Sequence, residues 1–230
     1  MLDVHDVSVR ESRPSSDSSL IMITASATTP QNESGTPQRS VVLASTSSYR
    51  RELLARLRID FEVMSPHADE TPMPGEAPAA LALRLAKAKA MAVAQQHPEA
   101  IVIGSDQVAD LHGRPLGKPG THIRAVQQLQ SMRGQIVTFQ TAVAVVCLST
   151  GFHEVDLAAV KVKFRALTDT EIENYLQAER PYHCAGSAKS EGLGIALLES
   201  IENDDPTALI GLPLIRTARM LRAAGTQLLA

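Results

Sequence analysis

Residues 41–57 read VVLASTSSYRRELLARL, and the change of pattern within this stretch decides the fold class. The first four residues form an apolar run that fits a short buried strand, whereas the run from Tyr49 to Leu57 is amphipathic and fits a helix. Phe61-Glu62-Val63-Met64 follows and predicts a second strand. A strand, a helix and another strand in close succession indicate an α/β arrangement with a parallel crossover.

The same alternation continues toward the C-terminus. Ile101–Gly104 predicts a fully buried strand ending at Ser105 and Asp106, and His112-Gly113 predicts a hairpin turn. Further helices are expected at 79–96, 122–132, 167–178 and 214–224, and further strands at 136–148, 152–164 and 195–198. Thr168 with Glu171 three residues later forms the pattern of a capping box. The sequence therefore predicts a mixed α/β fold containing both parallel crossovers and antiparallel hairpins.

Composition narrows the functional class. The chain has 230 residues, 44% hydrophobic and 20% charged, as in an ordinary soluble globular protein. Its net charge of -3 argues against binding polymeric nucleic acid, which needs many phosphate contacts. We expect no membrane span, because no apolar run approaches about 20 residues. Cys147 and Cys184 lack metal-finger spacing and are expected to be buried thiols in a reducing, cytoplasmic setting.

Residues 1–38 differ from the rest in being rich in Ser, Thr and Pro, with scattered acidic residues. This composition predicts a disordered N-terminal extension, or a start site placed too early with Met22 as the alternative start. Residues 39–230 are expected to form the one functional domain.

A first candidate site lies where the strand 41–44 meets the following helix. Backbone N–H groups at such a helix start attract phosphate, and the hydroxyls of Ser45 and Ser47 add donors. Arg50 adds a guanidinium suited to phosphate oxygens. An ordinary Ser N-cap followed by solvated arginines explains the same residues and stays open as an alternative.

Carboxylates form a second candidate site. Asp106 follows a buried strand, and Asp69 and Glu70 lie in a Pro-rich loop after the strand 61–64. Carboxylates together with phosphate oxygens and waters are what Mg²⁺ requires in a nucleotide site. For Asp106 alone, a polar residue closing a strand is the competing interpretation.

Lysines complete the set. Lys87 and Lys89 lie two apart on a predicted helix, so both cannot line one site. Lys118 lies in a stiff Gly-Lys-Pro turn that restricts its backbone. Solvated surface lysines are the alternative, but cations and carboxylates near strand ends fit metal-assisted phosphoryl chemistry. No Walker-type loop, dinucleotide fingerprint or Gly-x-Ser-x-Gly elbow occurs.

The chain resembles the Maf-like nucleoside triphosphate pyrophosphatases. Matching segments occur in the family's order: LASTSSYRRELL (43–54), Asp-Glu-Thr (69–71), RLAKAKA (84–90), IGSDQV (103–108), GKP (117–119), HCAGSAKSEGLG (183–194) and GLPL (211–214). Each segment alone is weak evidence, but the ordered set is specific. The resemblance implies an elongated mixed sheet flanked by helices, two lobes around a nucleotide cleft and, in many members, a homodimer.

The resemblance also implies roles for individual residues. Asp106 would be the proton acceptor, and it would share a divalent cation, Mg²⁺ or Mn²⁺, with Asp69 and Glu70. Ser45, Arg50, Lys89 and Lys118 would bind phosphate. Water would attack the α-phosphorus of a nucleoside triphosphate and release pyrophosphate.

Three positions indicate the 7-methyl-GTP branch of the family: Tyr49, Gln107 and Glu191. The dTTP/UTP branch tends to show Arg, Thr and Gln there, and the methylated branch often carries Trp at the position of Tyr49. N7-methylated guanine is cationic and favours an aromatic face and a carboxylate. Action on dTTP, UTP or another modified nucleotide, and a non-catalytic nucleotide-binding regulator of division, are the alternatives.

Overall fold

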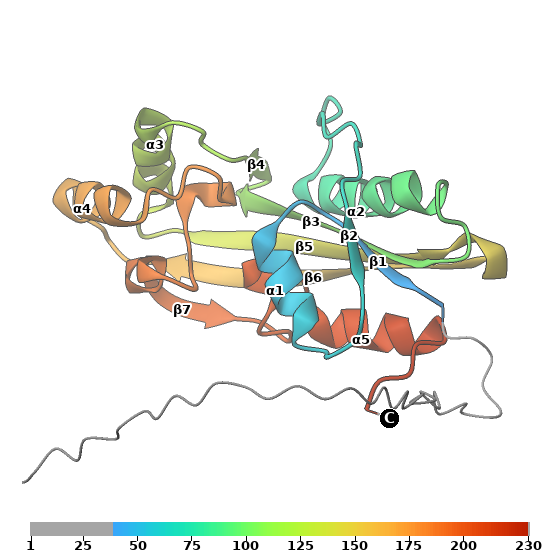
Figure 1. Cartoon of the computed structure of the whole chain (residues 1–230). Coiled ribbons are helices and arrows are strands. Elements are labelled where there is room, and N and C mark those ends of the chain that lie inside the picture. The colour runs from blue at the N-terminus through green and yellow to red at the C-terminus, as the bar shows by residue number, and fades with distance from the viewer. Residues whose placement is uncertain (1–38, 230) are drawn as a thin grey trace, which may run out of the picture. The chain divides into compact units, whose positions relative to one another are not determined.

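The computed structural model describes residues 39–229, whose chain runs through a seven-stranded mixed sheet. Two long antiparallel strands, β5 (Ile136–Cys147) and β6 (Phe152–Phe164), form its middle and pair along their whole length. The strand order is β2-β1-β3-β5-β6-β7, and β4 pairs with β3 off this path. Figure 1 shows these long strands crossing the whole unit.

One half of the sheet contains the parallel crossovers. β1 (Val41–Ala44) lies between β2 (Glu62–Met64) and β3 (Ile101–Leu111) and runs parallel to both. Helix α1 (Ser48–Ala55) connects β1 to β2, and α2 (Pro78–Ala94) connects β2 to β3. These two connections are the crossovers that the sequence predicts.

Antiparallel pairs complete the other half. β3 turns through His112 and Gly113, both with positive φ, into β4 (Arg114–Leu116). β7 (Leu198–Glu202) adds to the free edge of β6. Helices α3 (His122–Met132) and α4 (Asp169–Glu179) contact each other beside this half, and α5 (Leu214–Ala223) packs under the parallel half.

Apolar residues pack in three clusters, which divide the unit into two lobes. Two clusters cover the two faces of the parallel half: one lies under α2, around Leu85 and Val102, and the other under α1 and α5, around Leu43 and Met220. The third joins α3 and α4 to the far ends of β5 and β6, around Phe164. The long strands are shared by both lobes and therefore fix their spacing.

The sheet has a gap on one side of β3. β1 pairs with β3 only as far as Gly104, and β4 begins to pair at Ala109. The intervening residues 105–108 are paired with β5 alone. Ligands in open α/β sheets bind where a strand ends and its neighbour continues, so this gap marks a place for a site.

Most predicted elements are confirmed, with two corrections. The strand predicted to end at Ser105 and Asp106 continues to Leu111, because β5 keeps pairing with it to Asp110. The predicted strand at 195–198 is wrong: residues 193–197 form a short 3-10 helix, and β7 begins at Leu198. The capping box at Thr168 and Glu171 is confirmed.

Within residues 39–229, no helix combines the length and apolar character needed to cross a bilayer. The prediction of a disordered extension concerns residues 1–38, which lie outside the residues that the structure describes.

Candidate active site

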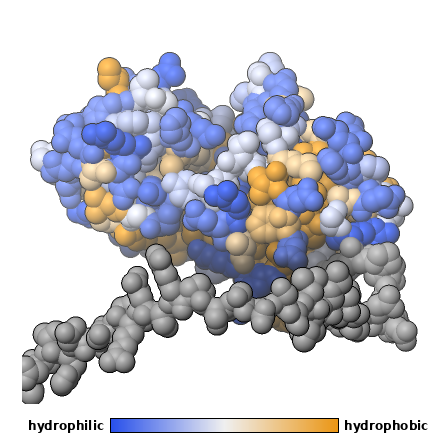
Figure 2. All heavy atoms as spheres, in the orientation of Figure 1, coloured by the Kyte–Doolittle hydropathy of each residue, from blue (hydrophilic) through white to orange (hydrophobic). Residues whose placement is uncertain are grey.

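A cleft of about 580 Å³ opens beside the gap in the sheet. Its walls come from both lobes: the β1–α1 corner and the loop after β2 on one side, and the segments around Lys118 and Cys184 on the other. Figure 2 shows the surface hollowed between the lobe that carries α3 and α4 and the projecting loop after β2. The cleft is thus a property of the two-lobed fold.

At the β1–α1 corner, short-range hydrogen bonds hold the chain in a tight curve. Ser45 Oγ accepts from the backbone N–H of Ser47 at 3.2 Å, and Ser47 Oγ accepts from that of Arg50 at 3.4 Å. Ser47 is therefore the N-cap of α1, as the alternative interpretation requires, yet it also lines the cleft. The helix start and its positive dipole end face a space large enough for phosphates.

Arg50 extends from α1 along the wall of the cleft. Its Nε donates to the carbonyl of Gly211 at 2.9 Å, and its Nη1 lies 3.5 Å from Ser45 Oγ. Burial lowers the pKa of the guanidinium, and the nearby charges of Asp106 and Glu70 oppose this effect. An arginine stays protonated in either case, so Arg50 supplies a fixed positive charge.

Lys89 joins two carboxylates from different elements. Its Nζ donates to Asp106 Oδ1 at 2.7 Å and lies 2.9 Å from Glu70 Oε1. The lysine and Asp106 are buried, whereas 56% of the Glu70 side chain is exposed. Lys87 is exposed, which confirms that the two lysines of α2 face different ways.

The close packing of α2 on β3 explains this contact. A Cβ at Gly104 would lie 2.3 Å from the carbonyl oxygen of Ala86, so only glycine allows the helix to approach β3 so closely. Asp106 lies two residues further along β3 and thus on the same face as Gly104. Its carboxylate is thereby brought against Lys89.

The three carboxylates predicted for metal binding do not all converge. Asp69 is exposed, and its Oδ1 accepts from the backbone N–H of Thr71 at 2.9 Å. Its neighbour Glu70 turns toward Lys89; burial alone would raise the pKa of Glu70, but Lys89, Lys118 and Arg50 lower it overall. Among residues 39–229, no three His, Cys, Asp or Glu side chains form a metal-binding group.

Gln107 lies on the opposite face of β3 from Asp106. Its amide nitrogen donates to the carbonyls of Ala208 and Leu209 at 3.0 and 2.9 Å, and lies 3.0 Å from Thr141 Oγ1. These bonds fix the amide orientation, and within the described residues no hydrogen bond is formed to Gln107 Oε1. The side chain thus ties the 208–211 segment to the sheet while lining the cleft.

Tyr49 and Glu191 line the cleft near Cys184. Burial, and then the negative charge of Glu191, raise the pKa of the Cys184 thiol. Burial also raises the pKa of the Tyr49 hydroxyl. The expectation of two buried thiols is right for Cys147 and wrong for Cys184, which is only half-buried and lines the cleft.

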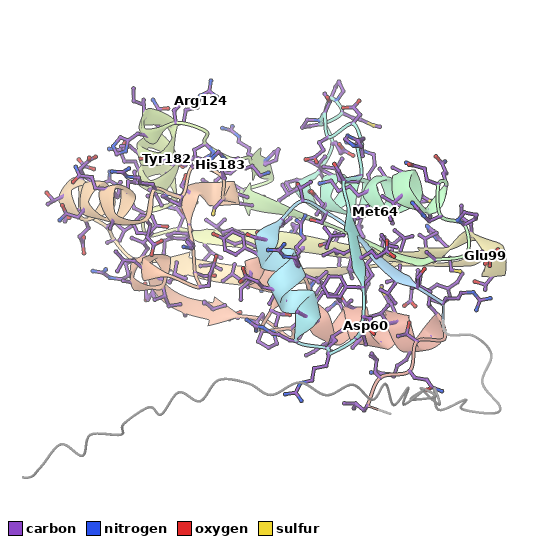
Figure 3. The ribbon with its side chains drawn as sticks, viewed as in Figure 1. Asp60, Met64, Glu99, Arg124, Tyr182 and His183 are labelled. Atoms are coloured by element: carbon purple, nitrogen blue, oxygen red, sulfur yellow. The ribbon has the colours of Figure 1, made fainter. Side chains whose placement is uncertain are left out.

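Lys118 lies in a turn fastened to the 182–186 segment. The N–H of Gly120 donates to the Tyr182 carbonyl at 3.0 Å, and the Tyr182 hydroxyl lies 3.0 Å from His122 Nδ1. Figure 3 shows Tyr182 and His183 beside α3, where this segment forms the rim of the cleft. Lys118 and His183 therefore enter the cleft from the α3–α4 lobe.

The structure brings most of the predicted residues into one cavity. Neither Asp106 nor Asp69 is among the lining residues, although Asp106 is hydrogen-bonded to Lys89, which is; the predicted residues that line the cavity are Ser45, Tyr49, Arg50, Glu70, Lys89, Gln107, Lys118 and Glu191. The wall at Leu209–Gly211 is not predicted from side chains, because it binds Arg50 and Gln107 through backbone carbonyls. Its sequence signal is the GLPL segment, which begins at Gly211.

Comparison with known proteins gives a consistent result. The family model described as "Maf-like protein" matches residues 40–224. A protein of Polaromonas sp. strain JS666 named "7-methyl-GTP pyrophosphatase" is 72% identical over 192 residues, which cover 84% of this chain and 88% of that protein.

Two further relatives carry the same name. The protein of Albidiferax ferrireducens is 68% identical, with 84% of this chain and 96% of that protein covered. The protein of Burkholderia thailandensis is 58% identical, with 80% of this chain and 87% of that protein covered.

Proposed function

This chain belongs to the Maf-like protein family, and from that premise we propose that it hydrolyses 7-methyl-GTP to 7-methyl-GMP and diphosphate. The relatives named for this activity share 58–72% identity with it over at least 80% of its length. The sequence resemblance implies the same activity and the same branch of the family.

The observation that carries the proposal is the cleft itself. Cationic and hydroxyl donors line it together with a carboxylate held by Lys89, and Tyr49 and Glu191 line the same cavity. A nucleoside triphosphate has the complementary arrangement, with a polyanionic tail and a planar base. Cavities of roughly 300–1,000 Å³ bind ligands of this size, and the cleft falls in that range.

In this proposal the triphosphate binds at the N-terminus of α1 and along the positively charged side chains of the cleft. The backbone N–H group of Ser48 and the free Nη donors of Arg50 bind phosphoryl oxygens. Lys118 approaches the same oxygens from the opposite lobe. Because these cations come from both lobes, the bound triphosphate holds the lobes together around it.

Asp106 is the proposed proton acceptor. A water molecule attacks the α-phosphorus, its oxygen bonds to phosphorus, and the bond from the α-phosphorus to the bridging oxygen breaks. Pyrophosphate leaves with the electron pair of that bond, and Asp106 takes the proton from the water. Lys89 fixes one oxygen of Asp106 and leaves the other free to accept this proton.

For a hard divalent cation we propose as ligands Glu70 and Asp106, which meet at Lys89; Asp69, the third ligand that the resemblance implies, does not converge with them in this structure. Glu70 and Asp106 each engage Lys89 through a single oxygen; each carboxylate oxygen has two acceptor sites, so Asp106 Oδ2 can bind the cation and still take the proton of the water. Mg²⁺ or Mn²⁺ bound there would neutralise negative charge on the phosphoryl oxygens.

Tyr49, Gln107 and Glu191 are the proposed base-recognition residues. The face of Tyr49 attracts the cationic methylated base by about 0.5–2 kcal/mol. Glu191 accepts from the guanine N1–H and amino group and complements the positive charge. Gln107 offers Oε1 as an acceptor, because its amide nitrogen is already engaged.

The decisive test is a nucleotide panel in H₂¹⁸O with Mg²⁺ or Mn²⁺, comparing 7-methyl-GTP, GTP, dTTP and UTP. We expect pyrophosphate release with the highest kcat/KM for 7-methyl-GTP, and ¹⁸O in the monophosphate. Label in pyrophosphate, or release of inorganic phosphate, would contradict attack at the α-phosphorus. Preference for dTTP or UTP would favour the other branch, and no turnover would favour a non-catalytic role.

The cytoplasmic location and the homodimer implied by the resemblance stay predictions.

A further inference from the structure

Glu191 lies in a tight turn on the rim of the cleft. The N–H of Gly192 donates to the carbonyl of Lys189 at 3.1 Å, which closes a four-residue turn with Glu191 at its third position. Glu191 is exposed, and it lines the cleft near Tyr49. Its placement therefore depends on whatever holds this turn.

One carboxylate from α4 holds both ends of the turn. Glu179 Oε2 lies 3.2 Å from Lys189 Nζ, and Glu179 Oε1 accepts from the backbone N–H of Leu193 at 2.7 Å. Only 18% of the Glu179 side chain is exposed. A single residue outside the cleft thus binds the chain on both sides of Glu191.

The surrounding packing leaves little freedom to this arrangement. A Cβ at Gly192 would lie 2.6 Å from Glu179 Oε1, and a Cβ at Gly194 would lie 2.4 Å from the Lys189 carbonyl. Tyr175, one turn earlier on α4, accepts the N–H of Lys189 at 3.0 Å through its hydroxyl. Two residues on one face of α4 therefore fasten the turn.

Three charged side chains lie around the turn that carries Glu191. Lys189 carries one positive charge, and Glu179 and Glu191 carry two negative charges. The hydrogen bond to Glu179 raises the pKa of Lys189, and the nearby Tyr49 and Glu191 act in the same direction. If Glu179 were neutral, the Lys189 ammonium would offset the charge of Glu191.

We propose that Glu179 is a positioning residue for base selectivity: by engaging Lys189 and Leu193, it leaves the charge of Glu191 available to a cationic base. This inference rests on the proposed preference for 7-methyl-GTP. Glu179 does not line the cleft, so it acts through the turn and not by contact with the nucleotide.

The test compares kcat/KM for 7-methyl-GTP with that for GTP in Glu179→Gln, at a pH where the methylated base keeps its N1 proton. The amide retains an acceptor for Leu193 but lacks the charge. We expect the ratio to fall on the order of fivefold, as for one partly exposed charge. The change should appear in KM for 7-methyl-GTP, because Glu179 does not touch the phosphates.

Two lysine variants separate electrostatics from folding. In Glu179→Gln with Lys189→Met, the positive charge is also gone, and the ratio should recover. Lys189→Met alone should raise the ratio above that of the unmodified chain. If Glu179→Gln acted by disturbing the fold, the double variant would not recover the ratio and Lys189→Met alone would not raise it.

Glu173→Gln is the matched control, because Glu173 lies on the same helix and pairs with His122 instead. It should leave the ratio unchanged. An unchanged ratio in Glu179→Gln, or no recovery in the double variant, would overturn the inference while the proposed function stands. An unmodified chain that releases pyrophosphate without preferring the methylated base would overturn both the inference and the proposed substrate.

Discussion

Asp106 has its two carboxylate oxygens in different situations. Oδ1 accepts from Lys89 at 2.7 Å, and among residues 39–229 no hydrogen bond is formed to Oδ2. A proton acceptor needs a free oxygen and a fixed orientation, and this arrangement provides both. Asp106 therefore meets both requirements.

Replacing Asp106 with Asn tests this role. Asn retains an oxygen that can accept from Lys89, so we expect the melting temperature to change little. The amide cannot take the proton of the attacking water, so kcat for pyrophosphate release should fall by roughly 10²–10⁴-fold. Steady-state assays with 7-methyl-GTP measure this change.

Asp110→Asn is the matched control, because Asp110 lies further along β3 and bonds the backbone N–H of Gly113 in the hairpin turn. Its kcat should stay close to that of the unmodified chain. A near-normal kcat in Asp106→Asn would remove Asp106 from the proton-transfer step.

For the helices and strands, the sequence predicts correctly those features that depend only on residues nearby in the chain. The capping box at Thr168 needs only its own helix, and it forms as expected. The end of β3 depends on its pairing with β5, which lies some thirty residues further along the chain. The extension of β3 to Leu111 could therefore not be predicted from the residues around it. Likewise, Gly194 packs against Lys189, and the chain forms a 3-10 helix where apolar residues suggested a strand.

The residues of the candidate site also differ in whether the sequence predicts them. Arg50 is predicted from its place after a strand, whereas position alone leaves Lys87 and Lys89 as alternatives and only the family resemblance selects Lys89. Glu179 is not predicted by either route, because its partners Lys189 and Leu193 become neighbours only when α4 packs beside the turn. Residues that act by holding other residues give no signal of their own in a single sequence.

The loop that carries Glu70 is held at its base by an ion pair. Arg84 on α2 binds both oxygens of Glu76, at 2.6 and 2.8 Å, and the carbonyl of Thr71 at 3.0 Å. The Arg84 hydrogen bonds lower the pKa of Glu76 from 4.5 to about 2. The ionised form is therefore favoured in the folded chain.

Glu76→Gln should thus destabilise the protein in a pH-dependent way. Because the folded pKa is depressed, the stabilisation by Glu76 is fully present above its unfolded pKa of 4.5 and disappears as the pH falls toward 2. Melting temperatures of the variant and the unmodified chain should differ near neutral pH and converge over that window. Glu199→Gln, at an exposed glutamate of β7, is the control, and a gap that stays constant in acid would contradict the prediction.

At the scale of the molecule, the cleft belongs to both lobes. Its lining runs from Ser45 to Gly211, and the strands β3, β5 and β6 that set its width are shared by the two lobes. The nucleotide proposed to bind there contacts α1 and α2 on one side and the 117–120 and 183–191 segments on the other. The proposed site therefore needs both lobes, which the shared strands hold in one sheet.

Removal of residues 1–38 tests whether residues 39–230 are sufficient for activity. Every residue that lines the cleft lies within the retained part, so kcat/KM for 7-methyl-GTP should stay within about twofold, the range expected when no substrate contact is lost. The cut must spare Ser40, whose carbonyl accepts the N–H of Ile101 at 2.9 Å beside β1. A chain that begins after Ala44 lacks β1, the strand between β2 and β3, and is expected not to fold. Circular dichroism measures this outcome. A loss of more than tenfold on removing residues 1–38 alone, with an unchanged melting temperature, would show that the extension contributes to substrate binding or chemistry.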